Sequence, residues 1–269
     1  MVQMIILGIV QGLTEFLPVS SSAHLVFTEH FLGVPRPGLV LEAVLHLGTA
    51  LAALVLFWPD VRRLLAGFLG SLRGPVPSRR GPADPYGRLA WLILLATAVT
   101  GVIGLTFLNR FERMFESLRG TALQLMVTGV ILLLARERGR REMLETRVFD
   151  ASALGLAQGI AIVPGISRSG ITIAAALWAG LRREEAARLS FLVAIPALVA
   201  AGLFALKDLP QAEALGYTPA QLLVGFAVSA VFGAIAIRWL LDWIRRGRLA
   251  AFAFYCWTVG LTVFLSTFR

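Results

Sequence analysis

FLPVSSSAH at residues 16–24 and IVPGISRSG at residues 162–170 interrupt two long apolar regions of the chain, 4–32 and 151–181. Proline, glycine and serine break each region near its middle, so each flanking half is shorter than the roughly 20 residues that cross a bilayer. Irregular backbone at membrane depth is stable only where it lines a cavity or is buried in protein. We therefore expect one re-entrant helical hairpin at 4–32 and another at 151–181.

The composition of the chain excludes an ordinary soluble fold. Of the 269 residues, 57% are hydrophobic and 15% are charged, against about a quarter charged in an average soluble domain. Mean hydropathy is +0.78, and six further apolar segments approach the length of a membrane crossing. These segments are 39–58, 88–108, 120–136, 186–206, 219–241 and 249–268. The sequence predicts an all-α polytopic membrane protein.

Composition also limits the partners of the chain. The formal net charge is +9, but the basic residues stand in short blocks between apolar segments. This pattern favours membrane lipids and argues against nucleic acid as a partner. The single cysteine, Cys256, lies in an apolar segment, so neither an intrachain disulfide nor a cysteine metal site is expected.

A shift of 147 residues aligns the two hairpins. It matches Leu7, Gly8, Gln11, Gly12, Ser20 and Ser22 with Leu154, Gly155, Gln158, Gly159, Ser167 and Ser169. Each repeat, 1–136 and 150–269, is then one hairpin followed by three crossings within a single membrane domain, 1–269. Because three is odd, the second copy starts on the opposite face and the repeats are inverted. Inverted repeats commonly place a binding site near the midplane, where the hairpin tips meet.

The distribution of basic residues sets the expected orientation. With this topology one face carries Arg36, Arg110, Arg113, Arg119, Lys207 and Arg269. The other carries the arginines of the 59–87 loop and of the 136–147 run, together with Arg182, Arg183, Arg188, Arg245, Arg246 and Arg248. The second face is richer in arginine and is predicted to be cytoplasmic. Both termini and the mouth of the first hairpin then face outward, and the Pro- and Gly-rich stretch 70–87 is a cytoplasmic connection.

The first hairpin supplies acidic and amide groups inside an apolar region. A carboxylate there costs roughly 2.5–3.5 kcal/mol at mid-membrane unless it is paired or hydrated. Gln11 and Glu15 are four residues apart, so they share one helical face. Their oxygens suit a hard divalent cation, Mg²⁺ or Ca²⁺. The alternative is a polar stripe that packs helices, but the broken hairpin beside the pair favours a cation site.

The serines of the first hairpin are candidates for catalysis. Ser20, Ser21 and Ser22 follow Pro18 and are expected to cap the second half of the hairpin. His24 comes three residues after Ser21 on the same face, which brings a hydroxyl and a titratable imidazole within reach of each other. Serine caps and helix-packing histidines are both common, so the pair indicates catalysis only together with the rest of the hairpin.

PGISRSG in the second hairpin has a phosphate-binding composition. Gly165 and Gly170 let the backbone approach a ligand closely, and Ser167 and Ser169 offer hydroxyls. Arg168 offers a fixed fork of donors. A helix that starts here also points its free N–H groups and positive dipole end at a bound anion. The alternative is an arginine that extends to the membrane interface, which fits poorly with its glycine and serine neighbours.

Three further polar residues are weaker candidates. Glu42 and His46 are four residues apart in the first predicted crossing. They either line the cavity behind the catalytic residues or have a structural role, and the sequence favours neither. Thr172, near the start of the last half-helix, is expected to add a hydroxyl to the phosphate site.

QGLTEFLPVSSSAH at 11–24 and PGISRSG at 164–170 resemble the two signature motifs of the undecaprenyl pyrophosphate phosphatases, also called bacitracin-resistance proteins. The resemblance continues through LEAVLHLGTALAALVLFW at 41–58 and over nearly the whole chain. It implies an enzyme of the bacterial cytoplasmic membrane that hydrolyses undecaprenyl diphosphate to undecaprenyl phosphate and phosphate. The family also implies a divalent cation, a site open to the outer face and a role in recycling the lipid carrier of cell-wall synthesis.

The resemblance also implies roles for individual residues. By position, Gln11 and Glu15 form the family's (Glu or Gln)-x-x-x-Glu element, while Ser21 and His24 are its catalytic hydroxyl and imidazole. The phosphate-binding loop is represented by Ser167, Arg168 and Thr172, and the other expected substrate contacts are Ser20, Ser22, Ser169 and Gly170. The chain departs from the family at two positions, since many members have Glu at position 11 and Gln is usual at position 46. Gln11 brings no charge, so cation affinity is expected to depend more heavily on Glu15.

Two other functions share some of these features. An inverted-repeat secondary transporter or lipid flippase also has broken helices, and phosphate release without a gradient distinguishes the phosphatase from it. The acid-phosphatase-type lipid phosphatases use a Ser-Arg-x₅-His element with a histidine nucleophile, but the corresponding residue here is Ala174. The sequence leaves the oligomeric state open, with a homodimer as one candidate.

Overall fold

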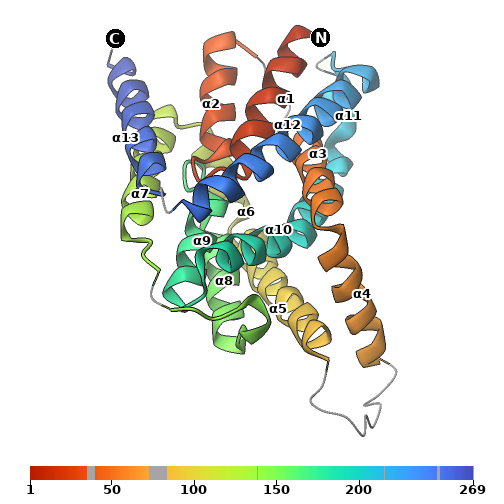
Figure 1. The fold of residues 1–269 in the computed structure, drawn as a ribbon. Helices are drawn as coiled ribbons and strands as arrows, with labels where there is room; N and C mark the ends of the chain where they lie inside the picture. The colour runs from red at the N-terminus through yellow and green to blue at the C-terminus, as the bar shows by residue number, and fades with distance from the viewer. Residues whose placement is uncertain (35–39, 73–83, 138, 215, 247–248, 269) are drawn as a thin grey trace, which may run out of the picture.

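The computed structural model describes the chain except residues 35–39, 73–83, 138, 215, 247–248 and 269. The described residues are almost entirely helical and contain no β-strand (Figure 1). This confirms the prediction of an all-α polytopic membrane protein.

Thirteen α-helices are present among the described residues. The first half of the chain forms α1 (Val2–Glu15), α2 (Ser21–Leu32), α3 (Val40–Leu56), α4 (Trp58–Leu72), α5 (Pro85–Thr106), α6 (Leu108–Phe115) and α7 (Leu118–Leu134). The second half forms α8 (Val148–Ile160), α9 (Arg168–Trp178), α10 (Arg183–Ala205), α11 (Leu209–Ala214), α12 (Pro219–Arg245) and α13 (Leu249–Ser266). Short 3₁₀ turns lie at Met143–Glu145 and Leu206–Asp208.

Each predicted hairpin is a pair of short helices separated by a break. Helices α1 and α2 have 14 and 12 residues, and α8 and α9 have 13 and 11. At 1.5 Å per residue, none of them spans the roughly 30 Å of a bilayer core. In Figure 1, α1 and α2 lie side by side in the upper part of the molecule, whereas α8 and α9 lie lower. The inverted relation of the two halves stays a prediction.

Four helices are long and apolar enough to cross a membrane on their own, namely α5, α10, α12 and α13. Each corresponds to one of the predicted crossings. Two further crossings arise only if a bent pair of helices counts as one span, because α3 meets α4 at 85° and α6 meets α7 at 102°. The described residues therefore provide four crossings, or up to six with the bent pairs.

Helix α4 lies where the sequence predicted a loop. Residues 59–87 were expected to be a loop, but a helix continues to Leu72 and buries Leu64 and Gly67. Gly67 allows close approach to α5, since a Cβ at this position would lie 2.5 Å from the backbone nitrogen of Gly87. The remainder of the predicted connection, 73–83, lies outside the described residues. That segment contains Arg73, Arg79 and Arg80 of the charge count, and four more of its arginines also lie outside the described residues, namely Arg36, Arg138, Arg248 and Arg269.

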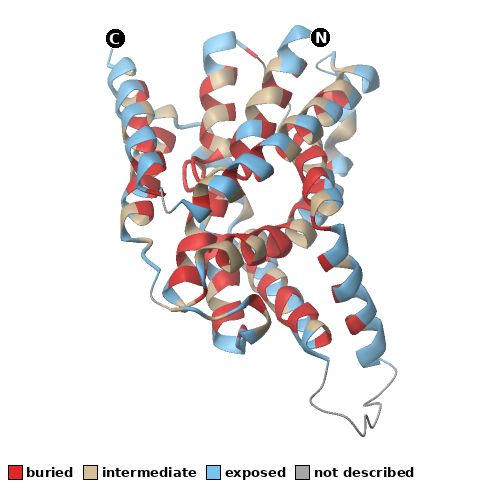
Figure 2. Ribbon diagram, viewed as in Figure 1, coloured by how far each residue is buried: buried red, intermediate tan, exposed pale blue. Residues whose placement is uncertain are grey.

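Helix α12 of the second half packs between α1 and α3 of the first half. Gly12 permits this packing because a Cβ there would lie 2.8 Å from the carbonyl oxygen of Ser229. Ser229 Oγ in turn donates a hydrogen bond of 2.9 Å to the Leu45 carbonyl on α3. Buried residues face inward along these helices, as Figure 2 shows. This packing fixes the C-terminal end of α1 relative to α3, and both helices contribute to the site below.

Many large apolar side chains remain exposed on the outside of the bundle. Phe149 is 81% exposed and Val102 is 66% exposed, and the exposed apolar residues are spread over most helices. A monomeric soluble protein rarely exposes apolar surface on this scale. The surface therefore fits a lipid environment.

Candidate active site

The first hairpin turns between Glu15, the last residue of α1, and Ser21, the first residue of α2. Ser20 in the turn has φ = 66°, which is uncommon for a residue other than glycine. Its hydroxyl oxygen caps α2 by accepting a 3.3 Å hydrogen bond from the Ala23 amide. The turn brings Ser21 Oγ within 2.6 Å of Glu15 Oε2, so the hydroxyl donates to the carboxylate. A hydroxyl beside an acceptor for its proton is the arrangement of an activated nucleophile.

Glu15 lies at the centre of the site, with its side chain 3% exposed. Its Oε1 accepts a 2.5 Å hydrogen bond from Arg168 Nη2 of the second hairpin. Its Oε2 accepts from Ser21 and, at 2.8 Å, from Gln11 Nε2. His46 Nε2 lies 3.3 Å from the same oxygen. A buried carboxylate is stable only when its charge is compensated, and the arginine provides that compensation here.

The N-terminus of α9 holds Arg168. Gly165 precedes it with φ = 101°, and a Cβ at this position would collide with the Thr121 carbonyl on α7, so the turn requires glycine. Ser167 Oγ caps α9 by accepting a 3.1 Å hydrogen bond from the Gly170 amide. Arg168 Nη1 is buried and has no hydrogen-bond partner among the described residues. One donor of the guanidinium is therefore available beside the free N–H groups of a helix N-terminus, where anions bind.

The tips of the two hairpins touch each other. Ser169 Oγ donates a 2.9 Å hydrogen bond to the Leu17 carbonyl of the first hairpin. Ser22 Oγ accepts a 3.3 Å hydrogen bond from the Gly165 amide of the second. These contacts place serines of both hairpins around the Arg168–Glu15 ion pair.

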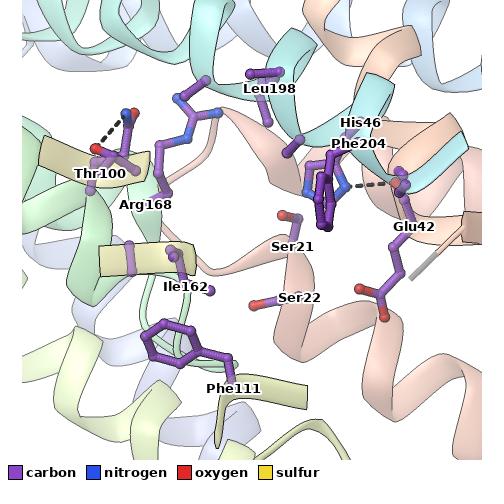
Figure 3. A pocket seen from close by; sticks show the side chains of 18 of the residues that line it. Ser21, Ser22, Glu42, His46, Thr100, Phe111, Ile162, Arg168, Leu198 and Phe204 are labelled. Atoms are coloured by element: carbon purple, nitrogen blue, oxygen red, sulfur yellow. Dashed lines mark hydrogen bonds between the residues drawn. The ribbon is translucent and has the colours of Figure 1, made fainter. Parts of the chain in front are cut away.

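A cavity of about 490 Å³ opens beside this point. Its polar lining comes from the hairpins and from α3, α5 and α6, namely Glu15, Ser20, Ser21, Ser22, Gln158, Ser167, Arg168, Glu42, His46, Thr97, Thr100 and Glu112. Most of the remaining wall is apolar and comes from α5, α6 and α10, with Gly101, Leu105, Phe111, Leu198 and Phe204 among its residues. In Figure 3 the Ser21 and Ser22 hydroxyls point toward the side of the space from which Arg168 projects. The cavity suits a ligand with an anionic head and an apolar chain.

The chain matches the sequence profile of the family described as bacitracin resistance protein BacA over residues 4–262. It belongs to this family. Relatives described as undecaprenyl-diphosphatase include a protein of Methanobrevibacter smithii, 41% identical over 99% of this chain and 97% of that protein. Others are proteins of Halothermothrix orenii, 39% identical over 98% and 96% of the two chains, and of Desulfatibacillum aliphaticivorans, 42% identical over 99% and 98%.

Several residues predicted for the site of this BacA-family protein lie behind the cavity wall. Gln11 is fully buried and contacts Glu15 without lining the cavity. Thr172 is also fully buried, where it donates to the Arg168 carbonyl at 2.7 Å and shares a 2.6 Å hydrogen bond with Ser190 Oγ. Neither Ser169 nor Gly170 lines the cavity. Gln11 and Thr172 contact Glu15 and Arg168 from behind the wall, and the predicted roles of all four residues stay predictions.

The imidazole beside the Ser21 and Glu15 side chains belongs to His46. Its Nδ1 lies 2.6 Å from the Glu42 carbonyl oxygen and its Nε2 faces Glu15, so a residue expected behind the catalytic groups contacts one of them directly. His24 has other partners. Its Nδ1 lies 2.9 Å from the Ser20 carbonyl oxygen, and its Nε2 lies 2.8 Å from the Tyr255 hydroxyl of α13.

Sequence reasoning missed three polar residues near the site. Gln158 and Thr100 line the cavity, and Gln158 is the residue that the 147-residue shift aligns with Gln11, so the repeat held a signal for it. No sequence signal marks Tyr255, because it stands 231 residues from His24.

The oxygen donors of the cavity fit a divalent cation that arrives with a phosphorylated ligand. Glu15, Glu42 and Glu112 supply carboxylates to the cavity lining, and hard cations prefer such oxygens. The part of the chain that the structure describes contains no ready cluster of three or more His, Cys, Asp or Glu residues. The other ligands would come from phosphate groups and water, as is usual for Mg²⁺.

Proposed function

We propose that this BacA-family protein hydrolyses undecaprenyl diphosphate to undecaprenyl phosphate and inorganic phosphate. The observation that carries the proposal is the meeting of Ser21, Glu15 and Arg168 in one cavity with a largely apolar wall. Relatives of 39–42% identity over nearly their whole length are described as undecaprenyl-diphosphatase. Membership of the family and the chemistry of the cavity therefore support the same activity.

The second hairpin binds the diphosphate in this proposal. Arg168 donates to a phosphate oxygen through its unpaired Nη1, and the N-terminal amides of α9 add further donors. The isoprenoid chain lies along the apolar wall from α5 and α10. These donors face the charge that develops on the transferred phosphoryl group, and such electrostatic stabilisation is usually the largest contribution to catalysis.

Ser21 is the proposed nucleophile. Its Oγ forms a bond to the terminal phosphorus while its proton passes to Glu15 Oε2, the acceptor of its hydrogen bond. The bond between that phosphorus and the bridging oxygen breaks and releases undecaprenyl phosphate. Water then hydrolyses the phosphoserine to inorganic phosphate. Rapid quenching should trap a phosphoserine at position 21, whereas a mechanism in which Ser21 only positions a water gives none.

A divalent cation, Mg²⁺ or Ca²⁺, is part of the proposal. Glu15 would hold it together with the substrate phosphates, and Glu42 stands in the same lining. Such a cation would neutralise charge on the phosphate oxygens. Gln11 supports Glu15 from behind by donating to its Oε2.

A phosphate-release assay on the purified protein tests the proposal. The protein is supplied with undecaprenyl diphosphate in detergent, without a membrane or gradient, and with or without a chelator. Release of phosphate that depends on protein and falls with chelator is expected. A transporter or flippase would release none, and the absence of phosphate in every condition would refute the enzyme assignment.

The site also suggests how the protein sits in the membrane. We propose a location in the bacterial cytoplasmic membrane, with both termini and the cavity toward the outer face. The arginine-rich loops support this orientation because such loops favour the cytoplasmic side. A homodimer stays a prediction, which the mass of the purified protein in a lipid nanodisc would test.

A further inference from the structure

Gln158 presents an unpaired polar atom in the wall of the cavity. The residue is 3% exposed and lines the cavity from α8. Its Nε2 donates a 3.2 Å hydrogen bond to Thr100 Oγ1, while its Oε1 has no hydrogen-bond partner among the described residues. Buried polar groups in folded proteins are nearly always paired, so an unpaired one on a residue that lines a cavity points to a ligand.

The two glutamines of the repeat both have an unpaired Oε1 and differ in the partner of Nε2. Gln11 stands at the equivalent position of the first hairpin and uses its Nε2 to hold Glu15, four residues later. Four residues after Gln158 the chain has Ile162, which offers no acceptor. Gln158 is therefore buried like Gln11, but no carboxylate lies four residues later to accept from its amide.

Thr100 Oγ1 can hydrogen-bond to the amide of Gln158 in either of two orientations. Thr100 Oγ1 lies 2.9 Å from the Ala96 carbonyl and 3.0 Å from the Gly155 carbonyl, so it donates to one of them and accepts from Gln158. A half-turn of the amide exchanges its two ends, which have nearly the same size. The Thr100 hydroxyl then donates to Oε1, and Nε2 faces the cavity as a donor.

We propose that Gln158, oriented by Thr100, binds a phosphate oxygen in the cavity through Nε2. Arg168 Nη1 is a buried donor in the same cavity lining, and it lacks a partner within the described chain. Thr100 and Arg168 project into the space from the same side in Figure 3, across from Glu42. The second hairpin thereby supplies two side-chain donors to one anion, a fork from Arg168 and a single amide from Gln158.

This inference rests on the proposed function for the identity of the anion. The phosphate oxygen belongs either to the bound diphosphate or to the inorganic phosphate that hydrolysis releases. Substrate and product offer the same phosphate oxygens to the amide, and kinetic measurements distinguish which of them it binds. Contact with the substrate affects KM, and contact with the product affects the inhibition constant of phosphate.

The experiment compares five purified variants with the parent protein. Gln158→Met keeps the length of the side chain but removes the amide, and Gln158→Glu replaces its donor with a negative charge. Thr100→Val removes the orienting hydroxyl and Thr100→Ser restores it. Gln124→Met is the matched control, because Gln124 lies on α7 and does not line the cavity. KM and kcat are measured with a prenyl diphosphate, and inhibition is measured with inorganic phosphate.

Gln158→Met should raise KM or the inhibition constant of phosphate by about tenfold or more, the scale of a hydrogen bond to a charged group. Gln158→Glu should weaken binding further because it repels the anion. Thr100→Val should weaken binding in the same direction, with recovery in Thr100→Ser, while kcat changes less than KM. The control should match the parent. Unchanged KM and unchanged inhibition in folded Gln158→Met, or in Thr100→Val if that variant alone folds, would overturn the inference.

Failure of the proposed function gives a different result. If the parent protein releases no phosphate from any prenyl diphosphate, the enzyme assignment fails. Binding of inorganic phosphate is then measured by titration calorimetry for the parent and for Gln158→Met. Weaker binding by the variant supports the role of Gln158 as a phosphate ligand, and equal binding refutes it.

Discussion

At the scale of single residues, the Arg168–Glu15 ion pair combines two functions in one contact. Glu15 is the acceptor for the Ser21 proton, and Arg168 keeps that carboxylate ionised while offering its other nitrogen to a ligand. We expect Arg168→Ala and Glu15→Ala each to lower kcat/KM at least about a hundredfold, the scale of losing one stabilising donor. Phosphate release from the purified variants is the measurement.

Arg168→Lys and Glu15→Gln serve as the matched substitutions for this pair. Lysine keeps the charge but loses the planar fork, so Arg168→Lys should retain more activity than Arg168→Ala and less than the parent. Elution as a single folded species separates loss of chemistry from loss of fold. Near-native turnover by folded Arg168→Ala would contradict the assigned role.

Gln11 provides a second prediction at this scale, because its amide donates to Glu15 from outside the cavity. Gln11→Glu would set two carboxylates side by side in a region of low dielectric, and a nearby cation relieves their repulsion. The Mg²⁺ or Ca²⁺ concentration for half-maximal turnover should fall, and activity in chelator should drop below that of the parent. Gln11→Ala should raise the cation requirement and leave some activity, since Glu15 remains.

A cation titration of turnover for these three proteins at fixed substrate is the test. Identical half-saturation concentrations would show that Gln11 contributes only to helix packing.

The sequence predicted contacts between residues near Glu15 in the chain better than contacts between distant helices. Spacing along one helix identified Gln11 with Glu15, and the serines next to Pro18, because those relations are local. The same spacing argument predicted His24 beside Ser21. In the structure the His24 imidazole hydrogen-bonds to the Tyr255 hydroxyl of α13. His46 approaches Glu15 because α1 and α3 pack against each other and against α12. No spacing rule contains that information.

At the scale of elements, α13 braces the turn of the first hairpin. His24 Nδ1 faces a carbonyl oxygen, which can only accept, so Nδ1 carries the proton and Nε2 accepts from the Tyr255 hydroxyl. The two rings also stack, with centroids 5.6 Å apart. Next to Tyr255, the Cys256 thiol lies 3.7 Å from the Pro18 carbonyl. Two neighbouring residues of the last long helix thus hold the backbone that presents Ser21.

Tyr255→Phe should loosen this turn without touching the cavity. It removes one hydrogen bond, so we expect a loss of about 1 kcal/mol in stability and a fall in kcat of roughly tenfold, as misplaced catalytic groups lose turnover. KM should change little because the phosphate donors lie on the other hairpin. Steady-state kinetics and thermal unfolding measure both quantities, with Tyr86→Phe on α5 as a control that also loses one hydrogen bond, from Arg63. A Tyr255→Phe variant with parental kcat would show that hairpin packing alone holds the turn.

Sequence patterns located the breaks between helices but not the angles at those breaks. Pro18 and Pro164 mark the hairpins because proline and its neighbours interrupt a helix locally. The bends after α3 and before α7 follow from how these helices dock on their neighbours, and a helix of 17 residues looks the same in sequence whether or not it bends. Helix α4 was mistaken for a loop because its first two turns carry the charged residues Asp60, Arg62 and Arg63.

At the scale of the whole molecule, orientation in the membrane is open to a direct test. Gly70 on α4 has open space around its Cβ position and is predicted to face the cytoplasm, whereas the exposed Glu112 on α6 is predicted to face outward. In intact cells, a membrane-impermeant thiol reagent should label Glu112→Cys and spare Gly70→Cys. Permeabilised cells should label both. The native Cys256 is buried, so the parent chain serves as the unlabelled background, and the reverse pattern would invert the proposed topology.

The ion pair between the hairpins also has a consequence for how the protein is made. Its two residues are 153 positions apart, so a ribosome inserts Glu15 into the membrane long before Arg168 has been synthesised. During that interval the nascent first half carries a carboxylate without its arginine partner, and an unpaired charge at the centre of a bilayer costs roughly 2.5–3.5 kcal/mol. An interrupted chain retains this defect permanently, and only completion of the second half removes it. The contact that assembles the site thereby also distinguishes finished chains from fragments that the cell's proteases should destroy.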